Sequence, residues 1–249
     1  PDLRDAVFQN LDMVFFAAAA LPQNLRHRIE ALSIAARGVR LPFTSSLGST
    51  ETAPAATYMT WDSDVWGNIG LPAPESELKL VPHGDRLEAR FRGPHITPGY
   101  YRDPDLTAKA FDEEGFFSIG DAMRFLDPDD PAKGLLFDGR VAENFKLMTG
   151  TWVHPGTQGL AVIDAGGPVI QDAVITGHDR DEIGLIVFPN LGGCRSLCPD
   201  APEDEALEDL VQRPEIRARL MAGLAAHNSD NPAGSMRIAR VVITCAPAG

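Results

Sequence analysis

Several residue types are scarce in this sequence, and each scarcity excludes a class of protein. Only three of the 249 residues are cysteine, an odd number that argues against a disulfide-stabilised secreted domain and favours reduced thiols. The longest apolar run, residues 14–21, falls short of the about 18 residues that a transmembrane helix needs. The chain opens without a basic and apolar leader. We therefore expect a cytoplasmic protein with no membrane span.

Positive charge is scarce as well. The chain has 22 lysines and arginines against 35 aspartates and glutamates, a formal net charge of −13. Nucleic acid is not an expected partner, because its phosphates need a basic face. Cys194 and Cys198 have the spacing of half a zinc site, but no second half follows. We expect them to be an ordinary surface pair.

The first quarter of the chain, residues 1–65, has the pattern of an α/β layer. Residues 13–19 form a continuous apolar run that predicts a buried strand, and residues 41–45 predict a second strand. Between them, Pro22 predicts the start of a helix that runs to about residue 36. That helix would place three apolar side chains on one face: Leu25, Ile29 and Leu32.

The middle of the chain, residues 66–139, predicts antiparallel strands. Residues 77–81 and 86–92 alternate apolar and charged side chains, as strands with one wet face do. Frequent glycines and prolines are typical of a small barrel or meander. We also expect a short helix and two further strands, over residues 104–111, 122–126 and 135–137.

The last part of the chain predicts a small α+β domain. We expect two paired strands, two helices and a last strand, over residues 169–176, 182–188, 203–211, 214–228 and 238–244. The second helix would carry an apolar stripe of Ile216, Leu220 and Leu224. We place the domain boundary near residues 138–140, which gives domains of residues 1–139 and 140–249.

A small-residue loop at residues 45–52 follows a predicted strand. Such a loop lets the backbone approach a phosphate, while hydroxyl groups donate hydrogen bonds and the carboxylate of Glu51 holds a metal. Further on, Asp121 follows Gly120 at a predicted strand start, where an acid can accept both hydroxyls of a ribose. Taken alone, each segment is more typical of a polar turn than of a binding site.

Two other segments are rich in glycine. Residues 138–151 crowd charges and glycines at the predicted boundary, where Arg140 could reach a phosphate or ribose and a hinge could form. A solvated linker fits the same residues. In residues 92–101, glycine and proline predict a fixed chain reversal with a purely structural role.

Taken in order, these segments are more specific than any one of them. The succession is Gly48-x-Thr50-Glu51, Gly67-x-x-Gly70-x-Pro72, Gly93-Pro94 with Gly99-Tyr100, Gly120-Asp121, and Gly139-Arg140 with Glu143 and Lys146. It resembles the adenylate-forming superfamily of acyl-CoA synthetases, peptide-synthetase adenylation domains and luciferases, over almost the whole chain. Residues 50–54, 138–153 and 177–184 look most like feruloyl-CoA synthases.

The resemblance implies a fold class and an activity. The fold would be α/β plus α+β: the end of a large adenylation domain, with an α/β layer and a small β-barrel, followed by a small mobile domain. The enzyme would use ATP, Mg²⁺ and coenzyme A to convert a carboxylic acid such as ferulate into an acyl-adenylate and then a thioester. The alternatives are a fatty-acyl or carrier-protein-loading adenylating enzyme, and a non-catalytic nucleotide-binding remnant.

The resemblance also implies roles for individual residues. Thr50 would contact the nucleotide phosphate and Glu51 would hold Mg²⁺, as the catalytic pair. Gly48 would lie in the loop that closes over the adenine. Asp121 would bind the ribose hydroxyls, and Arg140 would reach the ribose or a phosphate.

In the second half, the resemblance implies a moving element. Glu143 and Lys146 would belong to the hinge, and Gly150 to a loop that approaches the thioester-forming site on the coenzyme A side. The lysine-containing phosphate loop that the family carries upstream has no match here, and no lysine follows Lys146. We therefore expect a fragment, truncated at both ends, that does not adenylate an acid by itself.

Overall fold

The computed structural model describes residues 3–18, 21–232 and 234–246. The chain divides into two compact units, Pro1–Ala142 and Glu143–Gly249. The division falls slightly beyond the expected boundary because strand β8 (Leu135–Arg140) continues the sheet of the first unit through Arg140. Arg140 therefore belongs to the first unit and not to the second.

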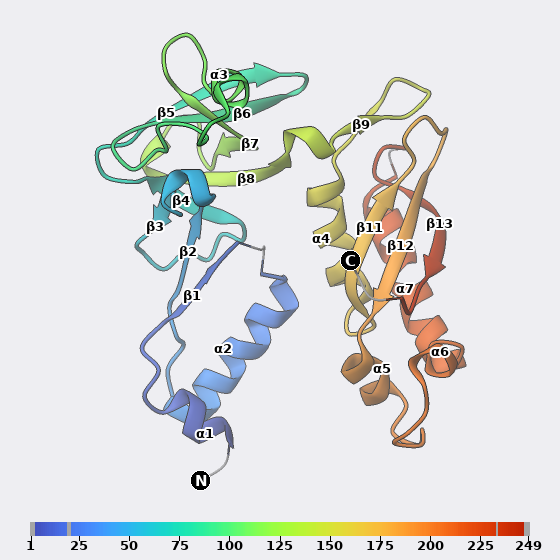
Figure 1. The fold of residues 1–249 in the computed structure, drawn as a ribbon. Coiled ribbons are helices and arrows are strands. Elements are labelled where there is room, and N and C mark those ends of the chain that lie inside the picture. The colour runs from blue at the N-terminus through green and yellow to red at the C-terminus, as the bar shows by residue number, and fades with distance from the viewer. Residues whose placement is uncertain (1–2, 19–20, 233, 247–249) are drawn as a thin grey trace. The chain divides into compact units, whose positions relative to one another are not determined.

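One eight-stranded sheet organises the first unit (Figure 1). Its strand order is β1-β2-β3-β4-β8-β7-β6-β5. The remaining strands are β1 (Val14–Ala17), β2 (Phe43–Leu47), β3 (Thr57–Met59), β4 (Asn68–Pro72), β5 (Glu77–His83), β6 (Arg86–Arg92) and β7 (Phe117–Phe125). β1 and β2 pair in parallel, as the strand–helix–strand pattern predicts, and the other neighbours are antiparallel.

The middle strands do not form a separate barrel. β4 pairs with β3 on one side and with β8 on the other, so the strands of residues 66–139 extend the sheet of the α/β segment. In this order β1 and β5 are the two edges. The prediction of a small barrel is corrected in this respect.

Strands β5 to β8 separate apolar from charged side chains, as their alternation predicts. Their apolar side chains form a core that includes Ala89, Phe91, Phe117, Ile119, Met123 and Leu135. Among the charged residues, Arg90 donates to Glu88 at 2.7 Å and to Asp112 at 3.1 Å. Lys79 lies 2.7 Å from the same Asp112 carboxylate. The alternation is as predicted, but the charged side is not a wet face: Glu88 is 7% exposed and the Arg86 side chain 8%.

Helix α2 (Gln23–Arg37) turns an unexpected side toward the sheet. Arg26 is buried, while Leu25 and Leu32, which were predicted to pack, are 39% and 43% exposed. The guanidinium carbon of Arg26 lies 5.1 Å from the centroid of the Phe43 ring on β2. Apolar spacing correctly predicted a helix but not its buried side, where Arg26 also donates to the Ser63 carbonyl at 2.9 Å.

Strand β1 is less buried than its apolar run predicts. Side chains alternate along it, and Phe15 is 54% exposed. The predicted strand continued to residue 19, which lies outside the described residues. A helix that was not predicted, α1 (Leu3–Phe8), precedes it. Large exposed apolar side chains are frequent in this part of the chain: Leu3, Val7, Met13, Phe15, Leu25, Leu32, Ile34 and Val39.

We expect these exposed apolar side chains to make residues 1–249 self-associate. The double substitution Leu25→Gln and Leu32→Gln should shift the chain toward monomer, measured by sedimentation velocity. The melting temperature should change little, because exposed substitutions usually alter stability by less than about 0.5 kcal/mol. Met221→Gln, at a residue of the second unit that is 61% exposed, is the matched control. Unchanged association in the double variant would contradict the expectation.

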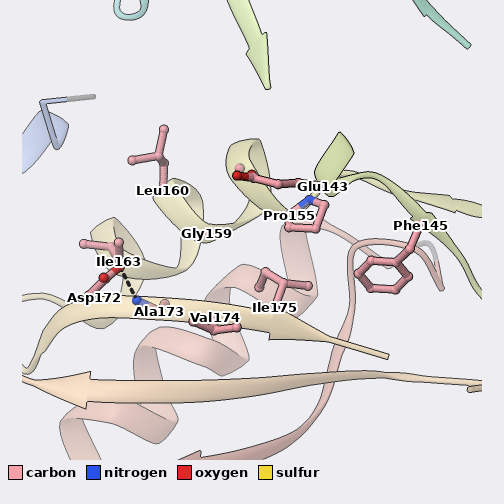
Figure 2. Close-up of a pocket in the computed structure, with 11 residues that line it drawn as sticks. Glu143, Phe145, Pro155, Gly159, Leu160, Ile163, Asp172, Ala173, Val174 and Ile175 are labelled. Carbon is pink, nitrogen blue, oxygen red and sulfur yellow. Dashed lines mark hydrogen bonds between the residues drawn. The ribbon is translucent and has the colours of Figure 1, made fainter. Parts of the chain in front are cut away.

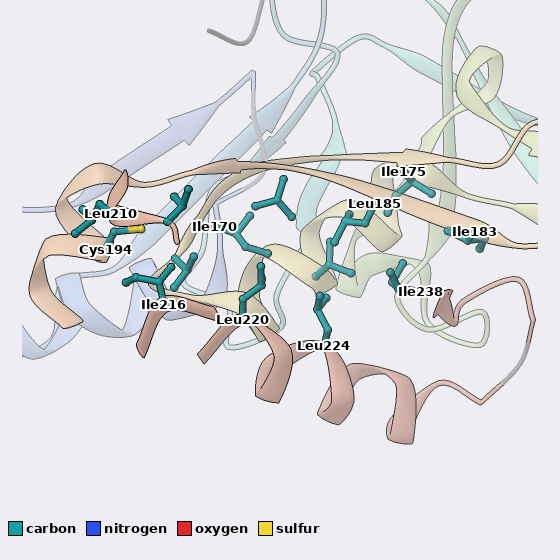
Figure 3. Close-up of a cluster of buried hydrophobic side chains, with 14 of the residues drawn as sticks. Ile170, Ile175, Ile183, Leu185, Cys194, Leu210, Ile216, Leu220, Leu224 and Ile238 are labelled. Carbon is teal, nitrogen blue, oxygen red and sulfur yellow. The ribbon is translucent and has the colours of Figure 1, made fainter. Parts of the chain in front are cut away.

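The second unit is built on a three-stranded sheet in the order β11-β12-β13. β11 (Ile170–Thr176) and β12 (Ile183–Pro189) are antiparallel, and β13 (Ile238–Ile243) runs parallel to β12. Helices α4 (Pro155–Gly166) and α7 (Pro214–Asp230) pack with each other, and α4 packs on β11. Figure 3 shows the predicted α7 stripe, Ile216, Leu220 and Leu224, directed into the core below the strands.

Two predictions for the second unit are wrong. The helix expected over residues 203–211 is one short turn, α6 (Leu207–Leu210), since its sequence crowds like charges that repel along a helix. Cys194 and Cys198 are buried in the core and not on the surface, because helix α5 (Leu191–Leu197) faces inward. Burial raises the pKa of the Cys194 thiol to about 11.

The remaining elements are short. They are helix α3 (Pro104–Ala110), the 3₁₀ turns η1 (Thr50–Thr52), η2 (Pro131–Lys133) and η3 (Val141–Glu143), and the antiparallel hairpin of β9 (Phe145–Lys146) and β10 (Trp152–Val153). In the part of the chain that the structure describes, no helix has the length and apolar character to cross a membrane.

Candidate functional site

The segment after β2 forms a tight turn around η1. The Thr52 hydroxyl closes it, accepting from the Ser49 backbone N–H at 2.9 Å and donating to the Ser49 carbonyl at 3.0 Å. A Cβ at Gly48 would lie 1.9 Å from the Pro54 carbonyl oxygen, so only glycine fits there without movement. The turn leaves Gly48 and Thr50 exposed.

Glu51, in the middle of this turn, is held at both its backbone and its side chain. The Thr97 backbone N–H donates to the Glu51 carbonyl at 2.8 Å, and the Tyr100 hydroxyl donates to Glu51 Oε1 at 3.0 Å. Hydrogen bonding by the Ser49 side chain, by the backbone of Glu51 itself and by Tyr100 lowers the pKa of Glu51. The carboxylate is therefore ionised at neutral pH.

An ionised carboxylate at this position fits a Mg²⁺–nucleotide complex. Mg²⁺ is usually held by one or two protein carboxylates together with substrate phosphates and water. Among the described residues, no group of three or more His, Cys, Asp and Glu side chains could hold a metal by itself. An ion at Glu51 would accordingly depend on the oxygens of the nucleotide.

Strands β7 and β8 bring Asp121 and Arg140 together as opposing residues. Arg140 Nε lies 3.2 Å from Asp121 Oδ1, and the two side chains are 56% and 7% exposed respectively. A buried carboxylate beside an exposed guanidinium can accept ribose hydroxyls and reach a phosphate.

The placement of Gly120–Asp121 differs from the prediction. The pair lies inside the long strand β7 and not at its start. Gly120 has a φ of +78°, and the register shifts between Asp121 and Met123. This irregularity lets one strand continue through residues whose composition is typical of a turn.

The other predicted site residues lie in the second unit. Glu143 is its first residue and is exposed. On β9, Lys146 Nζ lies 4.6 Å from the centroid of the Trp152 ring on β10. Gly150 has a φ of +81° in the hairpin turn, and its N–H donates to the Leu147 carbonyl at 2.8 Å. Gly48, Thr50, Glu51, Asp121 and Arg140 all belong to the first unit.

The second unit also contains a hollow between α4 and β11, with a volume of about 470 Å³ (Figure 2). Its lining is mostly apolar: Glu143, Phe145, Pro155, Gly156, Gly159, Leu160, Ile163, Asp172, Ala173, Val174 and Ile175. Among these described residues only Glu143 and Asp172 are charged, and both are acidic. The hollow therefore does not suit the phosphates of a nucleotide.

Sequence reasoning missed the part that residues 92–101 take in the site. It assigned this segment to packing alone, whereas Thr97 and Tyr100 both bind Glu51. The Gly99-Tyr100 pair in the ordered motifs is the one signal that could have indicated it.

No protein-family model matches the chain. A chloroplastic long-chain-fatty-acid–[acyl-carrier-protein] ligase from Arabidopsis thaliana is 29% identical over 186 residues, which are 68% of this chain and 25% of that protein. The human long-chain-fatty-acid–CoA ligase 6 is 33% identical over 116 residues, 43% of this chain and 16% of that protein.

The adenylation domain of a carboxylate reductase from Mycobacterium chelonae superposes with a TM-score of 0.67 at 21% identity, covering 94% of this chain and 33% of that one. The chain matches part of the adenylate-forming enzymes. It spans about a quarter of the length of the first curated relatives. The structural likeness shows an adenylation-domain-like α/β fold, and the sequence relatives named above are acid–thiol ligases.

Proposed function

We propose that residues 1–249 are part of an ATP-dependent acid–thiol ligase. The first unit would bind the nucleotide, and the second unit would be the mobile domain. The observation that carries the proposal is that one unit holds both an ionised Glu51, fixed in a tight turn, and a buried Asp121 beside Arg140. In the adenylate-forming motif order, these positions serve the metal, the ribose and the phosphate. The similarity to acyl-CoA and acyl-carrier-protein ligases supports it.

The reaction would proceed in two steps. A carboxylate oxygen of the acid attacks the α-phosphorus of ATP, and pyrophosphate leaves. The thiol sulfur of coenzyme A then attacks the acyl carbon, loses its proton and displaces AMP. Both steps depend mainly on charge stabilisation and positioning.

Each first-unit residue has a task in the first step. Glu51 would hold Mg²⁺, which neutralises charge on the phosphates, and the exposed hydroxyl of Thr50 would donate to a phosphate oxygen. Asp121 would accept from the ribose hydroxyls, and Arg140 would pair with Asp121 and reach the ribose or phosphate. The tight turn at Gly48 would let the backbone approach the nucleotide.

We propose a hydroxycinnamate such as ferulate as the acid. The basis is the resemblance of residues 50–54, 138–153 and 177–184 to feruloyl-CoA synthases. The two curated relatives described above are named for long-chain fatty acids, and one structural neighbour is an anthranilate CoA ligase in complex with anthranoyl-AMP. ATP–pyrophosphate exchange by the complete enzyme should be faster with ferulate than with octanoate or palmitate. Faster exchange with a fatty acid would establish the fatty-acyl alternative.

Glu143 is proposed as the hinge between the two steps. Proline there fixes φ near about −65° and removes a backbone donor, so the second unit would be kept in one orientation. If that orientation is the one used for adenylation, Glu143→Pro should leave single-turnover pyrophosphate release nearly intact while acyl-CoA formation falls at least about tenfold. Both half-reactions are measured on the same variant, and Glu143→Ala is the control. Equal losses in the two steps would contradict the hinge.

A further inference from the structure

The loop that contacts Glu51 is itself tightly built. At Gly99 the backbone has a φ of +139°, and a Cβ there would lie 2.5 Å from Thr107 Cγ2, so the chain passes against α3 without room for a side chain. The Thr107 hydroxyl accepts from the Tyr100 backbone N–H at 2.9 Å and donates to the Asp103 carbonyl at 2.8 Å. Asp103 also caps α3 through its side chain.

These hydrogen bonds form a chain of contacts that links α3 to the Glu51 carboxylate. α3 holds the backbone of Tyr100, and the Tyr100 hydroxyl holds Glu51 Oε1. From the same loop, Thr97 holds the Glu51 backbone.

We propose that Tyr100 is a positioning residue that fixes the Glu51 carboxylate for the Mg²⁺–nucleotide complex. The inference rests on the proposed function. Groups that hydrogen-bond a metal ligand orient it, and their loss typically weakens metal binding about 10- to 100-fold. Tyr100 would act through Glu51 and would not itself touch the substrate.

Tyr100→Phe removes only the hydroxyl. In the complete enzyme, the Mg²⁺ concentration for half-maximal ATP–pyrophosphate exchange should rise about tenfold, with kcat at saturating Mg²⁺ nearly unchanged. Binding of Mn²⁺–ATP without acid, measured by electron paramagnetic resonance, should weaken by the same factor. Thr107→Val should act in the same direction, and Thr107→Ser should restore the original behaviour.

The neighbouring Tyr101 offers a matched control, because it is 85% exposed. Tyr101→Phe should leave the Mg²⁺ dependence and Mn²⁺–ATP binding unchanged. If Glu51→Gln weakens Mn²⁺–ATP binding while Tyr100→Phe does not, the positioning role is overturned and the proposed function stands. If Glu51→Gln also leaves binding unchanged, Glu51 is not the metal ligand and both proposals fail.

Discussion

Glu51→Gln in the complete enzyme should lower the rate of pyrophosphate release by about 10²–10³-fold. The substitution keeps the shape of the side chain and removes the charge that would hold Mg²⁺ against the phosphates, and losing one such electrostatic contact typically costs that much. A glutamate is ionised at neutral pH, and the hydrogen bonds that lower the pKa of Glu51 favour the charged form further. Single-turnover release of labelled pyrophosphate measures the effect directly.

A second glutamate provides the control for charge alone. Glu113 is exposed in the same unit, so Glu113→Gln changes the net charge equally without touching the site. Its rate should match that of the unmodified enzyme. A loss of less than about threefold in Glu51→Gln would identify Glu51 as an ordinary turn residue.

Asp121→Ala should raise the KM for ATP about 10- to 100-fold and leave the KM for the acid nearly unchanged. The two oxygens would accept charge-assisted hydrogen bonds from the ribose, and losing them would cost about 1.5–3 kcal/mol in all, which corresponds to that rise in KM. Steady-state kinetics with ATP and the acid varied separately provide the measurement.

Asp121 also pairs with Arg140, so a higher KM in the alanine variant alone would not separate loss of ribose binding from a disturbed fold. Asp121→Asn keeps the shape and one acceptor, so it should have an intermediate KM for ATP and a melting temperature close to that of the unmodified enzyme. Equal KM increases for ATP and the acid would contradict a specific role at the ribose.

Sequence periodicity correctly predicted the helices and strands whose apolar pattern is clear within the segment itself. The stripe on α7 is confirmed, because its burial follows directly from the pattern. The alternation along β5 and β6 predicted the strands correctly but not the burial of Glu88. Helix α4 was missed since Gly156, Gly159 and Gly166 weaken its helical signal. Its stability comes from packing on β11 and α7, which no local window contains.

For the candidate site, the sequence predicted which residues take part but not all of the contacts between them. The order of motifs located Glu51, Asp121 and Arg140 along the chain, and β7 and β8 place the last two opposite each other. The bond between Tyr100 and Glu51 joins residues 49 positions apart, so no single segment indicates it. The division after Ala142 likewise depends on β8 continuing through Arg140, which is a matter of sheet pairing.

The buried thiols allow the unfolding of the second unit to be measured by cysteine labelling, independently of the first unit. All three cysteines of the chain lie in it: Cys194, Cys198 and Cys245. Cys245 is partly exposed and can react with a thiol reagent in the native state, whereas Cys194 and Cys198 react only when their core opens. The rate of slow labelling therefore reports local opening of the second unit, and the first unit contributes no signal. The stability of the second unit can therefore be followed in the intact chain, without separating the two units.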